Sequence, residues 1–332
     1  MLRVTLDDVA RLAGVSRSAA SRALNDRPGV KPDVRTRVLA AAAQLGFRPN
    51  RAARNLASGL SSVIGLVIPT DDLRVDPYGA AITHAVGRAA AHRDLGLMLH
   101  LAREEPGQTV HHILADGMVD GLLISAVAIG PGWVDELLDA PLPKVLIGSH
   151  PTRTDLVNVT VENVESTAAA VTHLFEQGCE RVGCIAGRAD RVDSRLRLDG
   201  YRLAHKRAGR KVDRALIVRG DYSRASGLAA TDRLLDRGVD AIFASNDEMA
   251  VAAVWTVTHR GLRVPRDVKV AGFDGLSIDE LIEPTLTTVA QPFDQIGTTA
   301  VDLLEAEIYG IADGRPVVVE PTLHVGGSSQ NL

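Results

Sequence analysis

The sequence predicts an all-α helix-turn-helix head followed by an α/β body of two doubly wound parallel sheets. Two observations predict this fold class. The first 46 residues have the pattern of short helices with helix-start and helix-stop residues, and from Val63 onward apolar runs alternate with amphipathic segments. Strands that alternate with helices pair in parallel and are covered on both faces. The alternation continues over about 270 residues, which suits two open α/β domains.

The composition is that of a globular protein. The 332 residues are 45% hydrophobic and 23% charged, which excludes a disordered or fibrous chain. Two cysteines, Cys179 and Cys184, are too few for a disulfide scaffold or a four-cysteine zinc site. The chain has no run of about 18 apolar residues and no charged-then-apolar leader. We therefore expect a cytoplasmic protein with no membrane partner.

The head begins with a helix whose start carries a capping box. Thr5 is the predicted N-cap, and Asp8, three residues later, completes the box. Gly14 ends this helix and permits a tight turn. Ser16 is the predicted N-cap of the second helix. One apolar stripe along the first helix is formed by Leu6, Val9, Ala10 and Ala13.

A third helix is predicted from Pro32 to a stop at Gly46. A helix, a short turn with glycine and a second short helix form the helix-turn-helix pattern.

Residues 1–60 carry eleven Lys/Arg and four Asp/Glu, a net charge of +7, whereas the remaining residues carry a net charge of −11. A basic head on an acidic body predicts contact with a polyanion, although a solvated basic face explains the charge alone equally well.

The second helix is the predicted DNA-recognition helix. Its exposed face carries Arg17, Ser18 and Arg22, which can meet base edges in the major groove. Arginine can donate two hydrogen bonds to guanine O6 and N7. Short polar side chains suited to phosphate contacts are Ser16, Ser21 and Asn25. The alternative is an ordinary helical hairpin in a core, which the basic charge and both helix starts disfavour.

A short segment at residues 50–58 lies within a predicted linker at 47–61. Asn50 is its predicted N-cap and Leu56 its largest apolar residue. About nine residues are too few for a stable isolated helix, so the segment should fold only on DNA or a partner. Leu56 is either a core residue or a wedge that unstacks a base step from the minor groove. Spacing alone favours the core.

Eight apolar runs of the body are predicted strands. They are Val63–Ile68, Leu97–Leu101, Gly121–Ser125, Val145–Ile147, Val182–Ile185, Ala215–Val218, Ala241–Ser245 and Val268–Gly272. Ligands of open α/β sheets sit beyond the carboxyl ends of the strands. Polar residues at these ends are therefore candidate ligand contacts, namely Ser125, Asn246, Asp247 and Asp274, with Arg197 from an arginine-rich segment. Taken singly, each is more often a helix cap or a salt-bridge partner.

Enzyme motifs are missing from the sequence. It contains no P-loop, dinucleotide-binding, nucleophile-elbow or H-E-x-x-H motif, so we expect no enzymatic activity, no catalytic residue and no cofactor. The adjacent His111 and His112 point to different sides, which disfavours a joint metal site. Cys179 and Cys184 are expected to be small core residues.

Seven stretches of the chain share the pattern of one protein family. In the head they are VTLDDVARLAGVS at 4–16, SRALN at 21–25 and LGFRPNRAARNLA at 45–57. In the body they are SRLRLDGY at 194–201, ASNDEMA at 244–250, VAGFD at 270–274 and LTTVAQPF at 286–293. These stretches closely resemble the lactose-repressor (LacI/GalR) family, and the resemblance spans nearly the whole chain.

The resemblance implies a homodimeric transcription factor that binds double-stranded operator DNA. It also implies a periplasmic-binding-protein-like body of two lobes joined by three crossovers, with a small effector between the lobes. The implied boundaries are 1–46 for the DNA-binding domain, 47–61 for a hinge, 62–161 with 292–322 for the N-terminal lobe, and 162–291 with 323–332 for the C-terminal lobe.

The resemblance further implies roles for single residues. Arg17, Ser18 and Arg22 would read bases, and residues 50–58 would form a hinge helix ordered only on DNA, with Leu56 as the minor-groove wedge. The implied DNA-binding set is Thr5, Ser16, Arg17, Ser18, Ser21, Arg22, Asn25, Asn50, Ala53 and Leu56. The implied effector set is Asp76, Tyr78, Ser125, Arg197, Tyr222, Asn246, Asp274 and Gln291. Tyr222 matches an aromatic residue that stacks on the ligand ring.

The sequence departs from the family pattern at several positions. Ala19 and Ala20 replace a Thr-Val or Pro-Thr pair, and Lys31 stands where a capping serine is common. The strand end at 145–149 lacks the Asp or Arg of many sugar-responsive members, which weakens the case for a sugar.

The predicted function is a repressor released from a near-palindromic operator by a small polar metabolite, expected to be a carbohydrate. Three alternatives remain: a corepressor-dependent repressor of purine-like ligands, a solute-binding protein without a DNA role, and an enzyme with an unrecognised motif. The sign of the ligand effect on DNA binding tests the first alternative. The basic head and the missing secretion signal disfavour the second, and the missing motifs disfavour the third.

Overall fold

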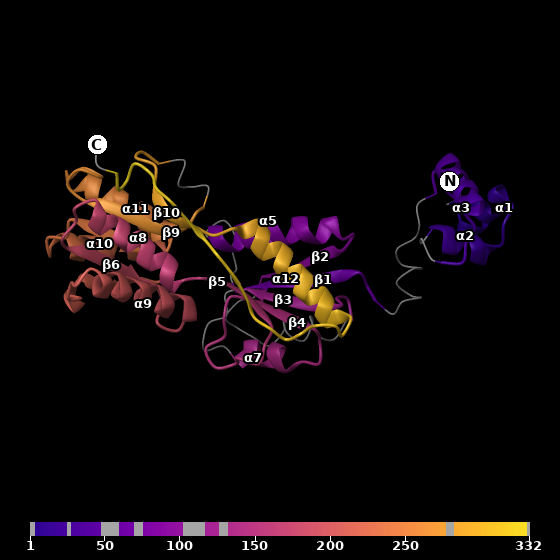
Figure 1. Ribbon diagram of the computed structural model, residues 1–332, viewed down its shortest axis with the longest axis horizontal. Coiled ribbons are helices and arrows are strands. Elements are labelled where there is room, and N and C mark those ends of the chain that lie inside the picture. The colour runs from indigo at the N-terminus through magenta and orange to yellow at the C-terminus, as the bar shows by residue number, and fades with distance from the viewer. Residues whose placement is uncertain are drawn as a thin grey trace. The chain divides into compact units, whose positions relative to one another are not determined.

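A computed structural model describes residues 4–24, 28–47, 60–69, 76–101, 117–125, 132–276 and 282–330. The chain divides into two units, one up to Ser61 that contains the head and a body from Ser62 onward. Figure 1 shows short helices in the first unit and two sheets flanked by helices in the second. The expected fold class is thereby confirmed.

The head contains the predicted three helices, α1 (Leu6–Ala13), α2 (Arg17–Leu24) and α3 (Pro32–Leu45). The capping box is present, because the Thr5 hydroxyl accepts the Asp8 N–H at 3.4 Å and the Asp8 carboxylate accepts the Thr5 N–H at 3.0 Å. Gly14 and Gly46 end α1 and α3 in the left-handed conformation that glycine adopts without strain. Lys31 occupies the N-cap of α3 without a side-chain cap.

The core of the head is made of small apolar residues on the three facing helices. Its buried members are Val9, Ala10, Ala13, Ala20, Ala23, Val38, Ala41 and Ala42. Alanine side chains allow short helices to approach closely, and the capped ends satisfy backbone groups that would otherwise lack partners. The packing therefore fixes α2 with its polar face outward.

The first lobe of the body is a six-stranded sheet in the order β11-β5-β4-β3-β1-β2. Its strands are β1 (Val63–Ile68), β2 (Gly96–Leu101), β3 (Gly121–Ser125), β4 (Lys144–Ile147), β5 (Asn158–Val161) and β11 (Val317–Val319). The helices of this lobe within the described residues are α5 (Pro77–His92), α7 (Gly132–Asp139) and α12 (Phe293–Ile308). All strand pairs are parallel. Helices α5 and α12 pack closely at Gly297, which has no side chain. A Cβ there would lie 2.6 Å from the Ala85 backbone.

The second lobe is a six-stranded sheet in the order β12-β10-β9-β8-β6-β7. Its strands are β6 (Val182–Ala186), β7 (Ile217–Arg219), β8 (Ala241–Ala244), β9 (Lys269–Asp274), β10 (Thr287–Ala290) and β12 (Thr322–His324). Its helices are α8 (Val164–Glu176), α9 (Val192–Arg207), α10 (Arg224–Leu235) and α11 (Asp247–His259). Only the β10–β12 pair is antiparallel among the strand pairs of the described residues.

The chain passes between the two sheets three times, after β5, after β10 and between β11 and β12. Figure 1 shows these connections as the chain segments that link the two lobes. Residues at or soon after the carboxyl ends of β3, β6, β7, β8 and β9 line the cavity between the lobes, so both sheets supply side chains to it.

One predicted strand is partly wrong. The run Ala215–Val218 begins as a short 3-10 helix, Arg214–Leu216, because the Asp213 side chain accepts the Ala215 N–H at 2.9 Å and caps that turn. Strand β7 starts only at Ile217.

Both cysteines are buried, as expected, and burial raises the pKa of the Cys184 thiol to about 12.

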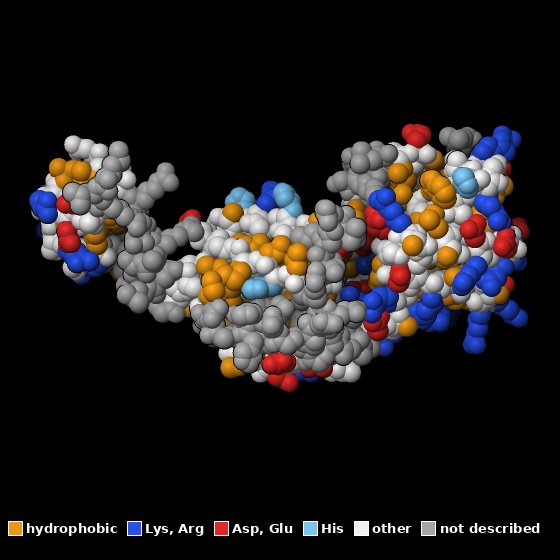
Figure 2. Space-filling model, turned by 180° about the vertical axis from the view of Figure 1, so that it is seen from behind, with side chains coloured by type: hydrophobic (Ala, Val, Ile, Leu, Met, Phe, Trp, Pro, Cys, Tyr) orange, Lys and Arg blue, Asp and Glu red, His pale blue; other side chains and the backbone are white. Residues whose placement is uncertain are grey.

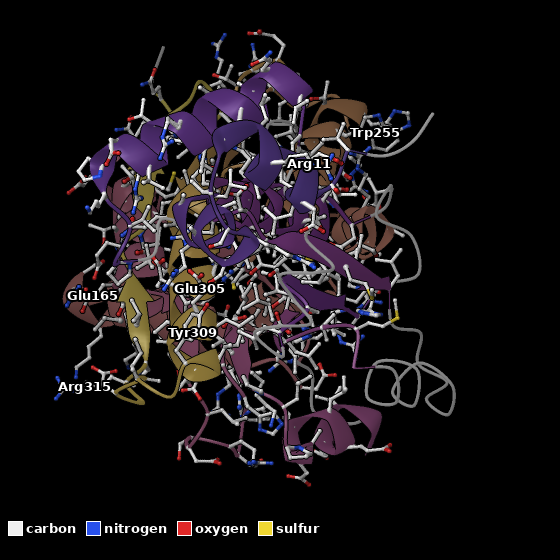
Figure 3. The ribbon with its side chains drawn as sticks, turned by 90° about the vertical axis from the view of Figure 1, so that its right-hand side faces the viewer. Arg11, Glu165, Trp255, Glu305, Tyr309 and Arg315 are labelled. Carbon is white, nitrogen blue, oxygen red and sulfur yellow. The ribbon has the colours of Figure 1, made fainter. Side chains whose placement is uncertain are left out.

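The surface of the second lobe carries interspersed basic and acidic side chains (Figure 2). Several of them form exposed ion pairs, such as Arg207 with Glu165 at 2.6 Å. One large aromatic side chain also lies at this surface. Trp255 is 56% exposed and stacks on His259, with ring centroids 4.7 Å apart (Figure 3). No helix in the described part of the chain is long and apolar enough to cross a membrane.

Candidate functional site

The polar face of α2 is the first candidate site. Arg17, Ser18 and Arg22 are exposed, while Ala20 and Ala23 of the same helix are buried. An exposed face with two arginines opposite a buried alanine face is the arrangement that a recognition helix needs. Arg17 also lies 3.6 Å from Asp7 of α1, an exposed ion pair that DNA phosphates or bases could replace.

Two predicted DNA contacts also have structural roles. The Ser16 hydroxyl accepts the Ala19 N–H at 3.2 Å and so caps α2, and the Thr5 hydroxyl belongs to the capping box of α1. Ser21 is half-buried on α2. The other predicted contacts lie outside the described residues: Asn25, Asn50, Ala53 and Leu56. All these DNA roles remain predictions.

The second candidate site is a cavity of about 300 Å³ between the two lobes. Seven of the eight predicted effector residues line it, three from the first lobe and four from the second. They are Asp76, Tyr78 and Ser125, and Arg197, Tyr222, Asn246 and Asp274. The eighth, Gln291, lines a small adjoining space and donates from Nε2 to Asp274 Oδ1 at 2.7 Å.

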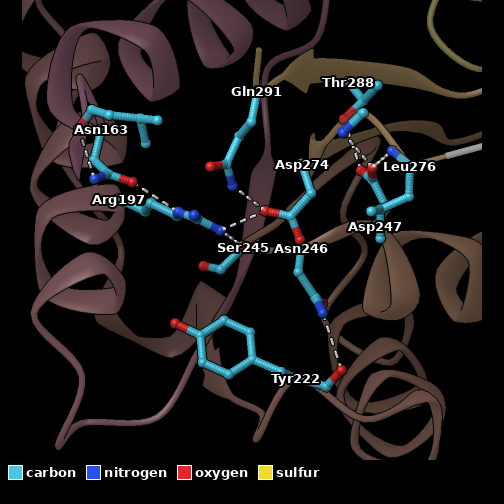
Figure 4. Close-up of polar contacts among 12 residues, drawn as sticks. Asn163, Arg197, Tyr222, Ser245, Asn246, Asp247, Asp274, Leu276, Thr288 and Gln291 are labelled. Carbon is cyan, nitrogen blue, oxygen red and sulfur yellow. Dashed lines mark hydrogen bonds and ion pairs between the residues drawn. The ribbon is translucent and has the colours of Figure 1, made fainter. Parts of the chain in front are cut away.

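Arg197 is held rigidly in the second lobe. Its Nε donates to Asn163 Oδ1 at 2.9 Å, and its Nη1 donates to the Ser245 carbonyl at 2.5 Å (Figure 4). Its guanidinium also lies 3.7 Å from the centroid of the Phe273 ring. Because these contacts occupy Nε and Nη1, the remaining nitrogen, Nη2, can donate to a ligand.

Asp274 lies at the end of β9 with a backbone φ of +128°, a value that residues other than glycine rarely adopt. Its carboxylate accepts hydrogen bonds from Arg197 at 3.3 Å and from Gln291. Burial raises the pKa of Asp274 to about 7, although Arg197 acts in the opposite direction. The carboxyl group is therefore placed in the cavity at a cost in free energy, which is typical of a functional site.

The Asp274 loop is shaped by a second buried carboxylate. Asp247 accepts the Gly275 N–H at 2.7 Å, the Leu276 N–H at 3.0 Å and the Thr288 hydroxyl at 2.6 Å (Figure 4). These bonds fix the backbone that follows β9. They explain how Asp274 is kept in its strained conformation.

Tyr222 is the other cavity residue with a positive φ, +76°. Its carbonyl accepts a hydrogen bond from Asn246 Nδ2 at 3.0 Å, while Asn246 Oδ1 accepts the Met249 N–H and caps α11. Its ring lies against Gly187, where a Cβ would be 2.3 Å from the ring. Burial raises the pKa of the Tyr222 hydroxyl to about 12, so it stays protonated and can donate.

The first lobe contributes a second aromatic ring. Tyr78 packs edge-on against Phe293, with centroids 5.8 Å apart, and burial raises the pKa of its hydroxyl. Asp76 caps α5 by accepting the Gly79 N–H at 2.9 Å. Ser125 ends β3, and its hydroxyl is buried without a hydrogen-bond partner among the described residues.

Several cavity residues were missed by sequence reasoning. They are Arg188, Arg191, Asp193, Asp221, Ser223, Glu248 and Leu276. The signal that could have found the first three is their position in the loop and the first helical turn that follow β6, since the strand-end rule applies to that strand as well.

Both units match known families. Residues 5–50 match the family described as bacterial regulatory proteins, lacI family, and residues 171–329 match the periplasmic binding protein-like domain. Catabolite control protein A of Priestia megaterium is 32% identical over 308 residues, which cover 91% of this chain and 92% of that protein. The chain belongs to the LacI family.

Further relatives agree with this family membership. The HTH-type transcriptional regulator CelR of Thermobifida fusca is 35% identical and covers 93% of each chain. A solved complex of CelR with cellobiose has a TM-score of 0.75 at 34% identity, over 98% of this chain and 100% of that one. The lac repressor dimer bound to operator and the anti-inducer ONPF has a TM-score of 0.78 at 29% identity, over 99% and 100%.

As a member of the LacI family, the chain is a DNA-binding transcriptional repressor. The relatives that match it are transcriptional regulators, and regulators of this kind are not enzymes.

Proposed function

We propose that this LacI-family repressor is a homodimer that leaves a near-palindromic operator when a small saccharide binds between its lobes. The observation that carries the proposal is the cavity of about 300 Å³ lined by polar side chains from both lobes. A ligand that contacts both lobes can favour one arrangement of the lobes over another. It shifts the equilibrium only by its difference in affinity for the two arrangements.

The chemistry of the cavity favours a saccharide. Arg197 Nη2 can donate to hydroxyl oxygens, and Asp274 and Asp193 can accept hydroxyl hydrogens. The Tyr78 and Tyr222 rings offer apolar surfaces to a sugar ring. Such a mixture of few polar groups and aromatic walls is typical of small-molecule pockets. The relative CelR has been solved with cellobiose, which supports the same ligand class.

The DNA side of the proposal rests on the head. Two copies of the head would place two α2 helices on successive major grooves, so the operator would be a near-palindrome. The lac repressor, a structural relative, is a dimer on its operator. The exposed Trp255 and His259 stack offers aromatic surface of the kind that subunit interfaces bury. The proposed location is the cytoplasm, where the DNA is.

The experiment combines a thermal-shift screen with a DNA-binding assay. Purified full-length protein is screened against sugars, sugar phosphates, polyols, nucleosides and purine bases, and ligand at about 100 times its Kd should add about 2.7 kcal/mol of stability. A sugar that raises Tm should also weaken binding to double-stranded sites selected from a random library. The effect should disappear in Arg197→Ala and persist in Arg195→Ala, an exposed arginine of the same helix. Normal induction of Arg197→Ala would mean that the pocket lies elsewhere.

A second candidate is a corepressor of planar, purine-like chemistry. The observation that favours it is the presence of two half-buried tyrosine rings, Tyr78 and Tyr222, in one cavity, because a planar ring stacks well on such surfaces. A purine base that raises Tm and tightens DNA binding would support this candidate. A sugar that raises Tm and weakens DNA binding would exclude it.

A further inference from the structure

Arg191 is a cation in the cavity wall whose Nε is buried and has no hydrogen-bond partner among the described residues. Burial lowers the pKa of its guanidinium, because the protein replaces little of the water that would stabilise the charge. Buried polar groups in native proteins are nearly always paired. An unpaired guanidinium nitrogen that lines a ligand cavity therefore indicates that its partner belongs to the ligand.

The other arginines of the cavity are already paired. Arg188 donates from Nε and Nη2 to Asp190 at 3.0 and 2.6 Å, in a two-point contact. Arg197 donates to Asn163, Ser245 and Asp274. Arg191 thus differs from both in having a charge that no described carboxylate neutralises by direct contact.

Most carboxylates of the lining are held by other groups and do not compete for Arg191. They accept hydrogen bonds within the protein: Asp76 from Gly79, Asp221 from Ser223, Glu248 from Arg224 and Asp274 from Arg197. Asp193 is the remaining acidic side chain of the lining. It lies close enough to Arg191 to raise the pKa of the guanidinium, but no ion pair joins the two side chains among the described residues.

Two further features of the cavity favour negative oxygen atoms. Arg191 is the N-cap residue of the 16-residue helix α9, whose first turn has no side-chain cap, so the positive end of the helix lies beside the guanidinium. From the other lobe, the Ser125 hydroxyl is 1% exposed, lines the same cavity and also has no partner among the described residues. Each lobe therefore presents an unpaired donor.

We propose that the ligand of this cavity carries an anionic oxygen group, a phosphate or a carboxylate, which Arg191 binds and to which Ser125 donates. The proposal rests on the saccharide-responsive function proposed above and narrows its ligand to an acidic saccharide. Hydrogen bonds from a guanidinium to an anion are roughly twice as strong as those between neutral groups. A neutral sugar can accept a hydrogen bond from Arg191 but supplies no opposite charge beside the guanidinium.

The test is calorimetric titration of the full-length protein with matched sets of ligands. Each set contains a neutral hexose, its uronate and its 6-phosphate, with glucose, galactose and mannose as the three hexoses. The best anionic member should bind at least about tenfold more tightly than its neutral partner, which corresponds to about 1.4 kcal/mol. The better of the uronate and the phosphate identifies the anionic group.

Three variants test whether Arg191 causes the preference for the anionic ligand. Arg191→Gln should remove the tenfold preference, whereas Arg191→Lys should retain part of it. Arg195→Gln removes one charge from the exposed side of α9 and should leave the preference intact.

The outcomes separate this proposal from the function on which it rests. If neutral hexoses bind as tightly as their acids and still release DNA, the anion proposal is overturned and the saccharide-responsive repressor stands. If the preference persists in Arg191→Gln, the assignment to Arg191 is overturned. If no sugar of these sets or of the thermal-shift panel binds, the saccharide proposal fails and the anion proposal fails with it.

Discussion

Arg197 on α9 and Asp274 at the end of β9 form an ion pair inside the body, with 3.3 Å between Nη1 and Oδ1 and side chains only 6% and 5% exposed. A buried ion pair adds little stability, because removing two charges from water costs about as much as their attraction returns. The raised pKa of Asp274, about 7, agrees with this imbalance. We infer that the pair is retained for ligand binding rather than for stability.

The pH dependence of stability should reveal the Asp274 carboxyl. Its folded-state pKa of about 7 exceeds its ordinary value of 3.8, so between these pH values the folded chain holds a proton that the unfolded chain has released. This group therefore stabilises the fold most below pH 4, and its contribution is lost as the pH rises through 7. The loss is at most about 4 kcal/mol. In Asp274→Asn this fall in unfolding free energy should be absent, as measured by urea unfolding from pH 5 to pH 8.

Asp267→Asn is the matched control. Asp267 is a half-buried surface carboxylate whose pKa is lowered to about 2 by its contact with Arg263. A lowered pKa has the opposite sign, so its contribution is lost only as the pH falls far below 5. Asp267→Asn should thus keep the wild-type slope between pH 5 and pH 8. A wild-type slope in Asp274→Asn would assign the titration to another group.

Gly187→Ala tests whether the Tyr222 ring must lie against the backbone after β6. A Cβ at position 187 would be 2.3 Å from the ring, so the ring must move into the cavity or away from it. Overpacking of this kind costs about 1–3 kcal/mol. We expect a lower Tm together with at least about tenfold weaker ligand binding, measured by calorimetry with the ligand found in the screen.

Gly87→Ala separates a local clash from a general effect of adding a methyl group. Gly87 lies within α5, and a Cβ there would meet only Leu97, at an ordinary 3.7 Å. Alanine in a helix interior is more stable than glycine by about 0.5–1 kcal/mol. The variant should therefore raise Tm and leave ligand affinity unchanged. Equal ligand affinity in both glycine variants would show that the position of the Tyr222 ring is unimportant.

The helices of the head could be predicted closely because their signals are local. Thr5, Gly14, Pro32 and Gly46 each act within one helical turn, and the structure places helix ends at all four. The strands β5 and β10 were not predicted because the prediction rested on continuous apolar runs, and both are four-residue strands that include polar residues. Thr287 of β10 is buried, and its hydrogen bonds come from Gly326, Ser328 and Ser329, about 40 positions later. Contacts of that range leave no local pattern.

The residues of the candidate cavity could be predicted only where their signal in the sequence is local. Ser125 and Asp274 were found because a polar residue directly at the end of an apolar strand is a local signal. Asn163, which orients Arg197 from 34 positions away, carries no such signal. The unpaired state of Arg191 depends on what the fold places around it, so only the structure reveals it.

Thr5→Ala should destabilise the head through its capping box. The Thr5 hydroxyl accepts the Asp8 N–H at 3.4 Å and donates to the Asp8 carboxylate at 2.7 Å, and both bonds are lost with the hydroxyl. Loss of an N-cap costs about 0.5–2 kcal/mol. Hydrogen exchange of the α1 amides in the full-length protein should report faster opening of this helix. Ser18→Ala, on the exposed face of α2, should leave that exchange unchanged, and an equal effect of both variants would contradict the capping role.

Arg22→Ala should remove base discrimination at one operator position. Arg22 is exposed on α2, and an arginine that donates two hydrogen bonds to guanine contributes about 1–3 kcal/mol of discrimination. Affinities are measured by fluorescence anisotropy on a selected site and on its single-base variants, at one fixed salt concentration because phosphate contacts make binding salt-dependent. Arg37→Ala removes an exposed arginine from α3 and should weaken binding to all variants equally. If Arg22→Ala also weakens binding equally for every variant, Arg22 contacts phosphate rather than a base.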